Sequence, residues 1–363
     1  MPDNTSDHTG NSISYQQIAL KLRSLNVEEI HGGNVYSRKI EYDFSVNINP
    51  LGCNETVYKA MEDAVRSVEN YPEYRAVSLR KKLADALNVN EDDLVITSGA
   101  SEAFTAICRA EKFSGGIVID PCFYGYEYAL DSVGADIIRL DKTDALLDME
   151  SFADTAVFLA NPNNPDGKLV NHEKLLSIAE YVTSCGGIVI TDECFLPLTG
   201  KLGESLAERI NGWNGLYVVR SFTKTFAIPG IRLGYVICSD MDKAIKLQKQ
   251  LPEWNVSNIA IAAGIAALDH TEDVKKAAEL INVEREFLFK SLMDVGLNVF
   301  PSDANYILFK GPEGLKEKLM DRKILIRDCS NYRNLGKGYF RVAVKDHRSN
   351  LKLMDELKNI INE

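Results

Sequence analysis

Seven short runs of mostly apolar residues, rich in valine and isoleucine, alternate with stretches of helical character between residues 94 and 238. Most runs lack a regular polar/apolar alternation, which is typical of strands buried on both faces of a largely parallel sheet. Helices fit between several of them, for example over 173–184. This order of elements predicts a layered α/β domain. The runs are 94–97, 116–120, 135–140, 156–160, 187–191, 216–220 and 233–238.

The segments on either side of this region differ from it. Residues 1–12 are polar and predict a disordered tail, and residues 13–25 carry apolar side chains at helical spacing. After about residue 240, helical patterns dominate and are followed by a few strand-like runs and a last helix. We expect an N-terminal tail and arm over 1–50, a large domain over 51–250 and a smaller α+β domain over 251–363.

Charge and cysteine usage exclude several classes of protein. The 52 acidic residues outnumber the 41 lysines and arginines, so the formal net charge is −11 and polyanionic partners such as nucleic acids are repelled. The seven cysteines are scattered without a C-x-x-C pair, which indicates neither a disulfide framework nor a zinc site. The N-terminus lacks the apolar core of a secretory signal, and no apolar run is long enough to span a bilayer. We expect a cytoplasmic protein without a metal, a nucleic-acid partner or a membrane partner.

Small, polar and charged residues follow five of the apolar runs. Because ligands of open α/β sheets bind beyond the carboxyl ends of the strands, these segments are expected to line one site. A glycine before Ser101 and Glu102 opens a helix N-terminus suited to an anion, although a simple N-cap explains the same residues. Asp192 closes an apolar strand, where a carboxylate needs a cation or a proton donor, and a structural ion pair is the alternative. The five segments are 98–102, 121–124, 161–167, 192–193 and 221–224.

Lys224 indicates which chemistry this site performs. It lies in sequence near Phe222, Phe226 and Ile228, where desolvation lowers the pKa of an amine and makes it nucleophilic. Hydroxyl groups and Arg232 close by suit a bound phosphate. A buried lysine, a phosphate site and a buried aspartate are what pyridoxal 5′-phosphate requires for covalent attachment, anchoring and pairing with its ring nitrogen. The sequence therefore predicts a pyridoxal-phosphate enzyme.

These residues resemble the fold-type I pyridoxal-phosphate family over nearly the whole chain, from His31 to about Arg348. The matching motifs are 164–167, Asp192, Ser221-x-x-Lys224 and Arg232. The resemblance implies a mostly parallel sheet of about seven strands in a three-layer large domain, with a smaller α+β C-terminal domain. It also implies catalytic roles for Lys224 and Asp192, which attach the cofactor and pair with its ring nitrogen. The other cofactor-binding residues that it implies are Ala100, Ser101, Phe123, Asn164, Ser221, Thr223, Arg232 and, across a homodimer interface, Tyr71.

Two subgroups of this family match the sequence. Histidinol-phosphate aminotransferases share the core motifs, whereas threonine-phosphate decarboxylases of cobalamin biosynthesis share longer strings. These strings are His31-Gly32-Gly33-Asn34, 43–52, 220–235, 303–308 and 324–332. Phe195 stands where many aminotransferases carry a tyrosine, as it does in the decarboxylases, although neutral packing also explains a phenylalanine there.

The resemblance implies decarboxylation of O-phospho-L-threonine to (R)-1-aminopropan-2-yl phosphate. The alternatives are transamination of histidinol phosphate or a similar amino-phosphate, and decarboxylation of O-phosphoserine. A regulator's effector domain is a third class, but the chain shows no helix-turn-helix segment or basic N-terminal extension, and Lys224 is intact.

Five residues are implied to bind the substrate: His31, Asn34, Asn49, Arg327 and Arg341. Among them, Arg341 is expected to bind the α-carboxylate, and His31, Asn34 and Arg327 the phosphate. A turn role for His31 and a surface ion pair for Arg327 are the alternatives. No role follows from the sequence for the region 255–258.

Overall fold

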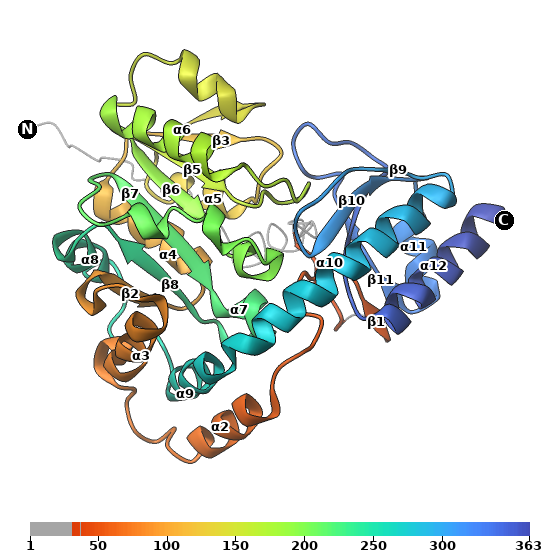
Figure 1. The fold of residues 1–363 in the computed structure, drawn as a ribbon, viewed down its shortest axis with the longest axis horizontal. Coiled ribbons are helices and arrows are strands. Elements are labelled where there is room, and N and C mark those ends of the chain that lie inside the picture. Colours follow the sequence, from red (N-terminus) through yellow and green to blue (C-terminus); the bar gives the residue numbers. More distant parts are fainter. Residues whose placement is uncertain (1–30, 37) are drawn as a thin grey trace, which may run out of the picture.

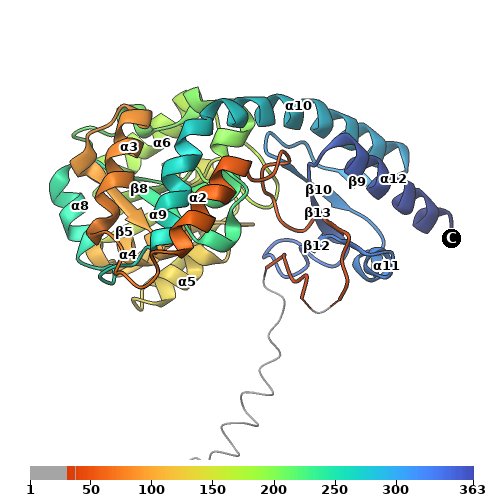
Figure 2. The same ribbon diagram turned by 90° about the horizontal axis from the view of Figure 1, so that it is seen from below.

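The structure, a computed structural model, describes residues 31–36 and 38–363. The tail and helix expected within residues 1–30 lie outside the described residues. One part of the molecule is built around a seven-stranded sheet and the other around a four-stranded antiparallel sheet (Figure 1). Helix α10 (Thr271–Asp294) runs from the first part to the second (Figure 2). No helix within the described ranges has the length and apolar character needed to cross a membrane.

The large sheet has the strand order β2-β8-β7-β6-β5-β3-β4. Only β8 runs antiparallel to its neighbours, so the expected mostly parallel sheet of about seven strands is confirmed. The central strands are buried on both faces, which explains their continuous apolar sequences. The strands are β2 (Leu94–Thr97), β3 (Gly115–Ile119), β4 (Asp136–Leu140), β5 (Thr155–Ala160), β6 (Ile188–Asp192), β7 (Leu216–Ser221) and β8 (Gly234–Cys238).

Helices cover both faces of this sheet and complete the three layers. Successive strand residues point to opposite faces, so Val157 packs in one core with Ile178 and Phe158 packs in the other with Phe104. One face carries α3 (Val77–Leu87), α6 (His172–Ser184) and α9 (Asn258–Ala267), and α2 (Glu55–Val65) packs on α9. The opposite face carries α4 (Ala100–Glu111), α5 (Gly125–Asp131) and α8 (Met241–Gln248).

The smaller part has the strand order β12-β13-β10-β9. The strands are β9 (Asn298–Val299), β10 (Tyr306–Lys310), β12 (Arg327–Asp328) and β13 (Tyr339–Ala343), and they pack against α10, α11 (Leu315–Asp321) and α12 (His347–Asn362).

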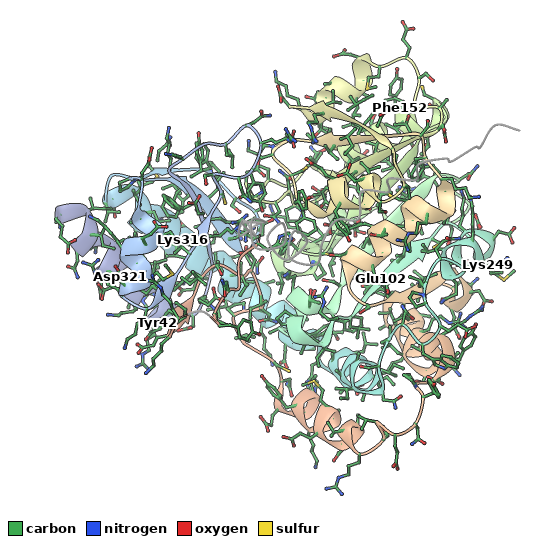
Figure 3. All side chains as sticks on the ribbon, turned by 180° about the vertical axis from the view of Figure 1, so that it is seen from behind. Tyr42, Glu102, Phe152, Lys249, Lys316 and Asp321 are labelled. Atoms are coloured by element: carbon green, nitrogen blue, oxygen red, sulfur yellow. The ribbon has the colours of Figure 1, made fainter. Side chains whose placement is uncertain are left out.

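The N-terminal arm joins this smaller part. β1 (Tyr42–Asp43) pairs in parallel with β11 (Ile324–Leu325), and Tyr42 lies on the same side of the molecule as Lys316 and Asp321 (Figure 3). The segment after β1 leads back to the large sheet, where the backbone N–H of Asn49 donates to the carbonyl of Lys224 at 2.9 Å. Residues 42–49 therefore line the space between the two parts.

Candidate active site

A cavity of about 260 Å³ lies at the carboxyl ends of the large sheet, facing the smaller part. It brings together residues from the N-terminal arm, five strand ends and the small sheet, which are separated by up to 310 positions in the sequence. The expected site residues that line it are His31, Ala100, Ser101, Phe123, Asn164, Asp192, Ser221, Thr223, Lys224, Arg232, Arg327 and Arg341. Tyr71, Asn34 and Asn49 do not line this cavity.

Lys224 lies on the single-turn helix α7 (Phe222–Thr225), which follows β7 directly. Burial lowers the pKa of its amine to about 8, and the positive charges of Arg341 and Arg232 contribute to the lowering. An amine with this pKa is partly neutral near physiological pH and can act as a nucleophile. The structure thus gives Lys224 the environment that its apolar neighbours in the sequence predict.

Asp192 is the last residue of β6 and is almost fully buried. Its Oδ1 accepts a hydrogen bond from the backbone N–H of Cys194 at 3.0 Å, and its Oδ2 accepts one from the Tyr126 hydroxyl at 2.6 Å. Burial raises the pKa of Asp192 above that of an exposed aspartate. A buried carboxylate of this kind is stabilised by a cationic or proton-donating group in the cavity.

The N-terminus of α4 and the end of β7 form a site suited to a phosphate. Gly99 precedes α4 with φ +83°, and Ala100 and Ser101 begin the helix, whose free N–H groups favour an anion. The hydroxyls of Ser221 and Thr223 lie 2.8 Å apart on the neighbouring segment. The Arg232 guanidinium lies directly against Gly99, so that even one added carbon at Gly99 would meet it at 2.6 Å.

Arg327 and Arg341 line the opposite wall of the cavity and are both buried. They are partners in the register of β12 and β13. Arg341 donates to the side-chain oxygen of Asn164 and to the carbonyl of Ser45 at 3.0 Å, while its buried Nε has no partner among the described residues. Arg327 donates to Asn331 Oδ1 at 2.8 Å.

His31 stands at the mouth of the cavity, with its ring centroid 5.7 Å from that of Phe123. Desolvation lowers the pKa of His31, and the charges of Arg327, Lys224 and Arg341 lower it further. The histidine is therefore mostly neutral near pH 7 and offers a hydrogen bond rather than a full charge. Asn34 lies nearby in the sequence but is exposed outside the cavity.

Asn49 has a different position from the one we expected for a substrate-binding residue. Its Nδ2 donates to the carbonyl of Thr225 at 2.9 Å, and its Oδ1 accepts from the N–H of Leu51 at 2.9 Å. The amide nitrogen thus holds the backbone of α7, and the amide oxygen holds the turn of the segment that carries Asn49. The nearby Asn47 lines the cavity instead, and its buried Oδ1 has no partner among the described residues.

The sequence did not predict two residues that line the cavity, Asn47 and Tyr332, or the buried Tyr126, which contacts Asp192 from outside the cavity. Tyr332 lines the cavity, and its hydroxyl donates to Asn164 Oδ1 at 3.3 Å. Asn47 and Tyr332 fall within the strings 43–52 and 324–332 that carry the family resemblance, which was an available signal. Tyr126 reaches Asp192 only because α5 packs on the sheet. It lies outside the motifs of the family resemblance, so the sequence did not indicate this contact.

Tyr71 does not line the cavity of its own chain. Its side chain is 80% exposed, and its ring centroid lies 4.7 Å from that of Trp254, which is also exposed. The residues after Trp254 have supporting positions: Asn255 donates to Glu102 Oε2 at 2.8 Å, Ser257 caps α9, and Asn258 donates to the carbonyls of Ser67 and Asn70.

Residues 39–357 match the protein family described as aminotransferase class I and II. The chain belongs to this family. Its cofactor is accordingly pyridoxal 5′-phosphate, and the residues fit that group: a nucleophilic amine, a helix N-terminus with hydroxyls and an arginine for the phosphate, and a buried carboxylate for the ring nitrogen.

Within the aminotransferase class I and II family, the chain is similar to proteins of two activities. Threonine-phosphate decarboxylase of Salmonella typhimurium is 31% identical over 91% of this chain and 96% of that protein. Histidinol-phosphate aminotransferase of Methanosphaera stadtmanae is 28% identical over 87% of this chain and 89% of that protein. The adenosylcobalamin biosynthesis bifunctional protein of Leptospira interrogans is 28% identical over 93% of this chain and 41% of that protein.

Solved structures of family members share the fold. The histidinol-phosphate aminotransferase of Clostridium acetobutylicum superposes with a TM-score of 0.80 at 28% identity, over 88% of this chain and 99% of that one. The L-threonine-O-3-phosphate decarboxylase of Porphyromonas gingivalis gives a TM-score of 0.80 at 24% identity, over 89% of this chain and all of that one. The expected fold-type I architecture is thereby confirmed.

Proposed function

We propose that this enzyme decarboxylates O-phospho-L-threonine to (R)-1-aminopropan-2-yl phosphate and CO₂, for the nucleotide loop of cobalamin. The observation that carries the proposal is the pair of buried arginines, Arg327 and Arg341, in one cavity with Lys224. Two guanidinium groups suit a substrate that carries both a carboxylate and a phosphate. The relatives named for threonine-phosphate decarboxylation and for adenosylcobalamin biosynthesis support the same substrate and pathway.

The cofactor is held by the polar groups of the large sheet. Ala100, Ser101, Ser221, Thr223 and Arg232 would bind its phosphate, Lys224 would attach to it, and Asp192 would pair with its ring nitrogen. Phe123 would lie against its ring, and Asn164 would donate to its ring oxygen. When bound, pyridoxal phosphate accepts the electron pair of the bond that breaks at the substrate α-carbon.

The substrate is held from the wall of the small sheet. Arg341, whose buried Nε has no hydrogen-bond partner among residues 31–36 and 38–363, binds the α-carboxylate, and the side-chain amide of Asn47 adds a further polar contact. Arg327 binds the phosphate, together with His31. Fixing both ends of a short substrate restricts rotation at the α-carbon, and this rotation decides whether the bond to the carboxylate or to hydrogen breaks.

Lys224 supplies the proton that completes the reaction. The bond between the α-carbon and the carboxylate breaks, CO₂ leaves, and one proton is added to the same carbon. The amine of Lys224 would donate this proton, because a pKa of about 8 in the cofactor-free protein allows it both to hold and to release a proton near neutral pH.

Transamination of histidinol phosphate or a similar amino-phosphate is the second candidate, supported by the aminotransferase relatives. Phe195 favours decarboxylation, because many aminotransferases carry a tyrosine at this position and the decarboxylases a phenylalanine. Phe195 lines the cavity without a hydroxyl and packs edge-on against Tyr306, with ring centroids 5.0 Å apart. O-Phosphoserine differs from O-phosphothreonine by one methyl group, worth roughly 1–3 kcal/mol in an apolar pocket. It therefore stands as a competing substrate.

The working form in this proposal is a homodimer with shared active sites. Tyr71 of one subunit reaches the cofactor phosphate of the other. Tyr71, Tyr74 and Trp254 are exposed, and both tyrosines contact Trp254, with ring centroids 4.7 Å apart for Tyr71–Trp254 and 6.2 Å for Tyr74–Trp254. Exposed aromatic patches of this kind are typical of protein interfaces.

The test is to mix the cofactor-loaded enzyme with O-phospho-L-threonine and to follow released CO₂ together with the cofactor absorbance. We expect CO₂ over many turnovers and an unchanged final cofactor spectrum. Stoichiometric conversion of the cofactor to its amine form without CO₂ would overturn the decarboxylase and favour the aminotransferase. Parallel assays with O-phosphoserine and histidinol phosphate then rank the three substrates.

A further inference from the structure

A buried tyrosine outside the expected site contacts the carboxylate of Asp192. The Tyr126 hydroxyl donates to Asp192 Oδ2 at 2.6 Å, and Tyr126 is only 2% exposed. The backbone N–H of Cys194 donates to the other oxygen, Oδ1, at 3.0 Å. Each carboxylate oxygen thus accepts a hydrogen bond from the described residues, and the Cys194 side chain also bonds to this carboxylate, which still leaves a lone pair for a group in the cavity.

The ring of Tyr126 is held by three phenylalanines. It stacks on Phe158 with centroids 5.0 Å apart, and it makes edge contacts with Phe104 at 5.1 Å and Phe123 at 5.6 Å. Because the ring is packed on several sides, the hydroxyl cannot easily turn away from Asp192. The same contacts tie Tyr126 to Phe123, which lines the cavity.

The direction of this hydrogen bond is fixed by the environment. Burial raises the pKa of Tyr126 well above that of an exposed tyrosine, and the charge of Asp192 raises it further, so the hydroxyl keeps its proton and donates. Burial also raises the pKa of Asp192, while the hydrogen bonds from Cys194 and Tyr126 oppose that rise. A carboxylate that accepts such bonds is a weaker base than one that lacks them.

We infer that Tyr126 is a positioning residue that keeps Asp192 ionised and oriented, so that the proton shared with the cofactor stays on the ring nitrogen. The inference rests on the role proposed above for Asp192. Without the hydroxyl, Asp192 is a stronger base and competes for that proton. The cofactor ring then withdraws electrons less effectively, whichever substrate the enzyme uses.

The experiment compares the Tyr126→Phe enzyme with wild type after loading both with pyridoxal phosphate labelled with ¹⁵N in the ring. Phenylalanine keeps the three ring contacts and removes only the hydroxyl. We expect the ¹⁵N resonance to move toward the unprotonated value and cofactor affinity to fall about tenfold. Tyr128→Phe is the matched control, because Tyr128 is an exposed residue of the same helix, and it should leave both quantities at their wild-type values.

Asp192→Asn separates this inference from the proposal on which it rests. If Asp192→Asn moves the ¹⁵N resonance and Tyr126→Phe leaves it in place, the role of Tyr126 is refuted while that of Asp192 stands. If neither variant moves the resonance, Asp192 does not pair with the ring nitrogen, and both assignments fall. A resonance that moves in both variants supports the inference even where the substrate proves to be different.

Discussion

Arg327 and Arg341 face each other across the antiparallel strands β12 and β13, as direct register partners. Side chains at such positions leave the sheet on the same face, and both arginines are buried and line the cavity. Like charges at opposed positions repel each other and destabilise a sheet. Anionic groups bound between the two guanidinium groups would reduce this repulsion. This relationship supports the proposal that an acidic chain acts on a substrate with two anionic groups.

Replacing each arginine by lysine in turn tests the two proposed roles separately, binding of the α-carboxylate by Arg341 and binding of the phosphate by Arg327. Arg341→Lys keeps the charge but loses the planar fork, and we expect kcat/KM for O-phospho-L-threonine to fall about 100-fold. Arg327→Lys is expected to lower the preference for O-phospho-L-threonine over L-threonine by about tenfold or more. Steady-state kinetics with both substrates measure these changes. Arg333→Lys, on the exposed loop beyond β12, is the control, and an unchanged preference in Arg327→Lys contradicts its phosphate role.

The low pKa of Lys224 predicts a pH-dependent stability of the cofactor-free enzyme. The native amine titrates near pH 8 and an unfolded lysine near 10.5, so the unfolded state binds more protons between these values and stability rises with pH there. Lys224→Met removes the buried charge and is expected to stabilise the cofactor-free protein by ~2 kcal/mol at pH 7. This difference should shrink between about pH 8 and 10.5.

Urea unfolding of the cofactor-free proteins at several pH values measures this difference. Lys249→Met is the matched control, because Lys249 is exposed and its amine stays in water in both states. If the difference in free energy of unfolding between wild type and Lys224→Met stays constant from pH 7 to pH 10, the native protein does not bury a charged amine at Lys224.

Gly99→Ala tests the phosphate site through the backbone. Gly99 has φ +83°, and an added Cβ would meet Arg232 Nη2 at 2.6 Å. We expect a loss of ~1–3 kcal/mol in stability from the strained backbone, and weaker cofactor binding because Arg232 is displaced. Thermal unfolding and equilibrium dialysis of the cofactor measure the two effects. At Gly230 an added Cβ meets nothing within 4 Å, so Gly230→Ala is the control and should show neither effect.

Subunit mixing tests the shared site. Lys224→Ala is expected to be inactive, and Tyr71→Ala to lose about tenfold in kcat/KM as a phosphate contact is removed. In a mixed dimer, one of the two sites carries both substitutions. The other site is intact, because it takes its lysine from the Tyr71→Ala subunit and its tyrosine from the Lys224→Ala subunit. Random pairing of equal amounts then restores about a quarter of the wild-type sites of a symmetric dimer. Activity in the mixture that does not exceed the average of the separate variants refutes a Tyr71 contribution across the interface.

The order of strands and helices and the chemistry of the cofactor site follow from the sequence. Strands buried on both faces need continuous apolar runs, and such runs are visible without any knowledge of their neighbours. The lysine, aspartate and glycine of the site lie at the carboxyl ends of those strands, where the topology of a parallel sheet must bring them together. Local patterns were therefore sufficient to predict that Lys224, Asp192 and Ser101 lie in one cavity.

Contacts between distant segments were decided only by the tertiary structure. Asn47 and Asn49 lie two positions apart in an irregular segment, where no strand or helix periodicity fixes the direction of a side chain, and only Asn47 lines the cavity. Tyr126 meets Asp192 because α5 packs on the sheet at one particular position, 66 residues away in the sequence. Arg327 and Arg341 become a pair only through the register of β12 and β13, which the packing of whole elements determines.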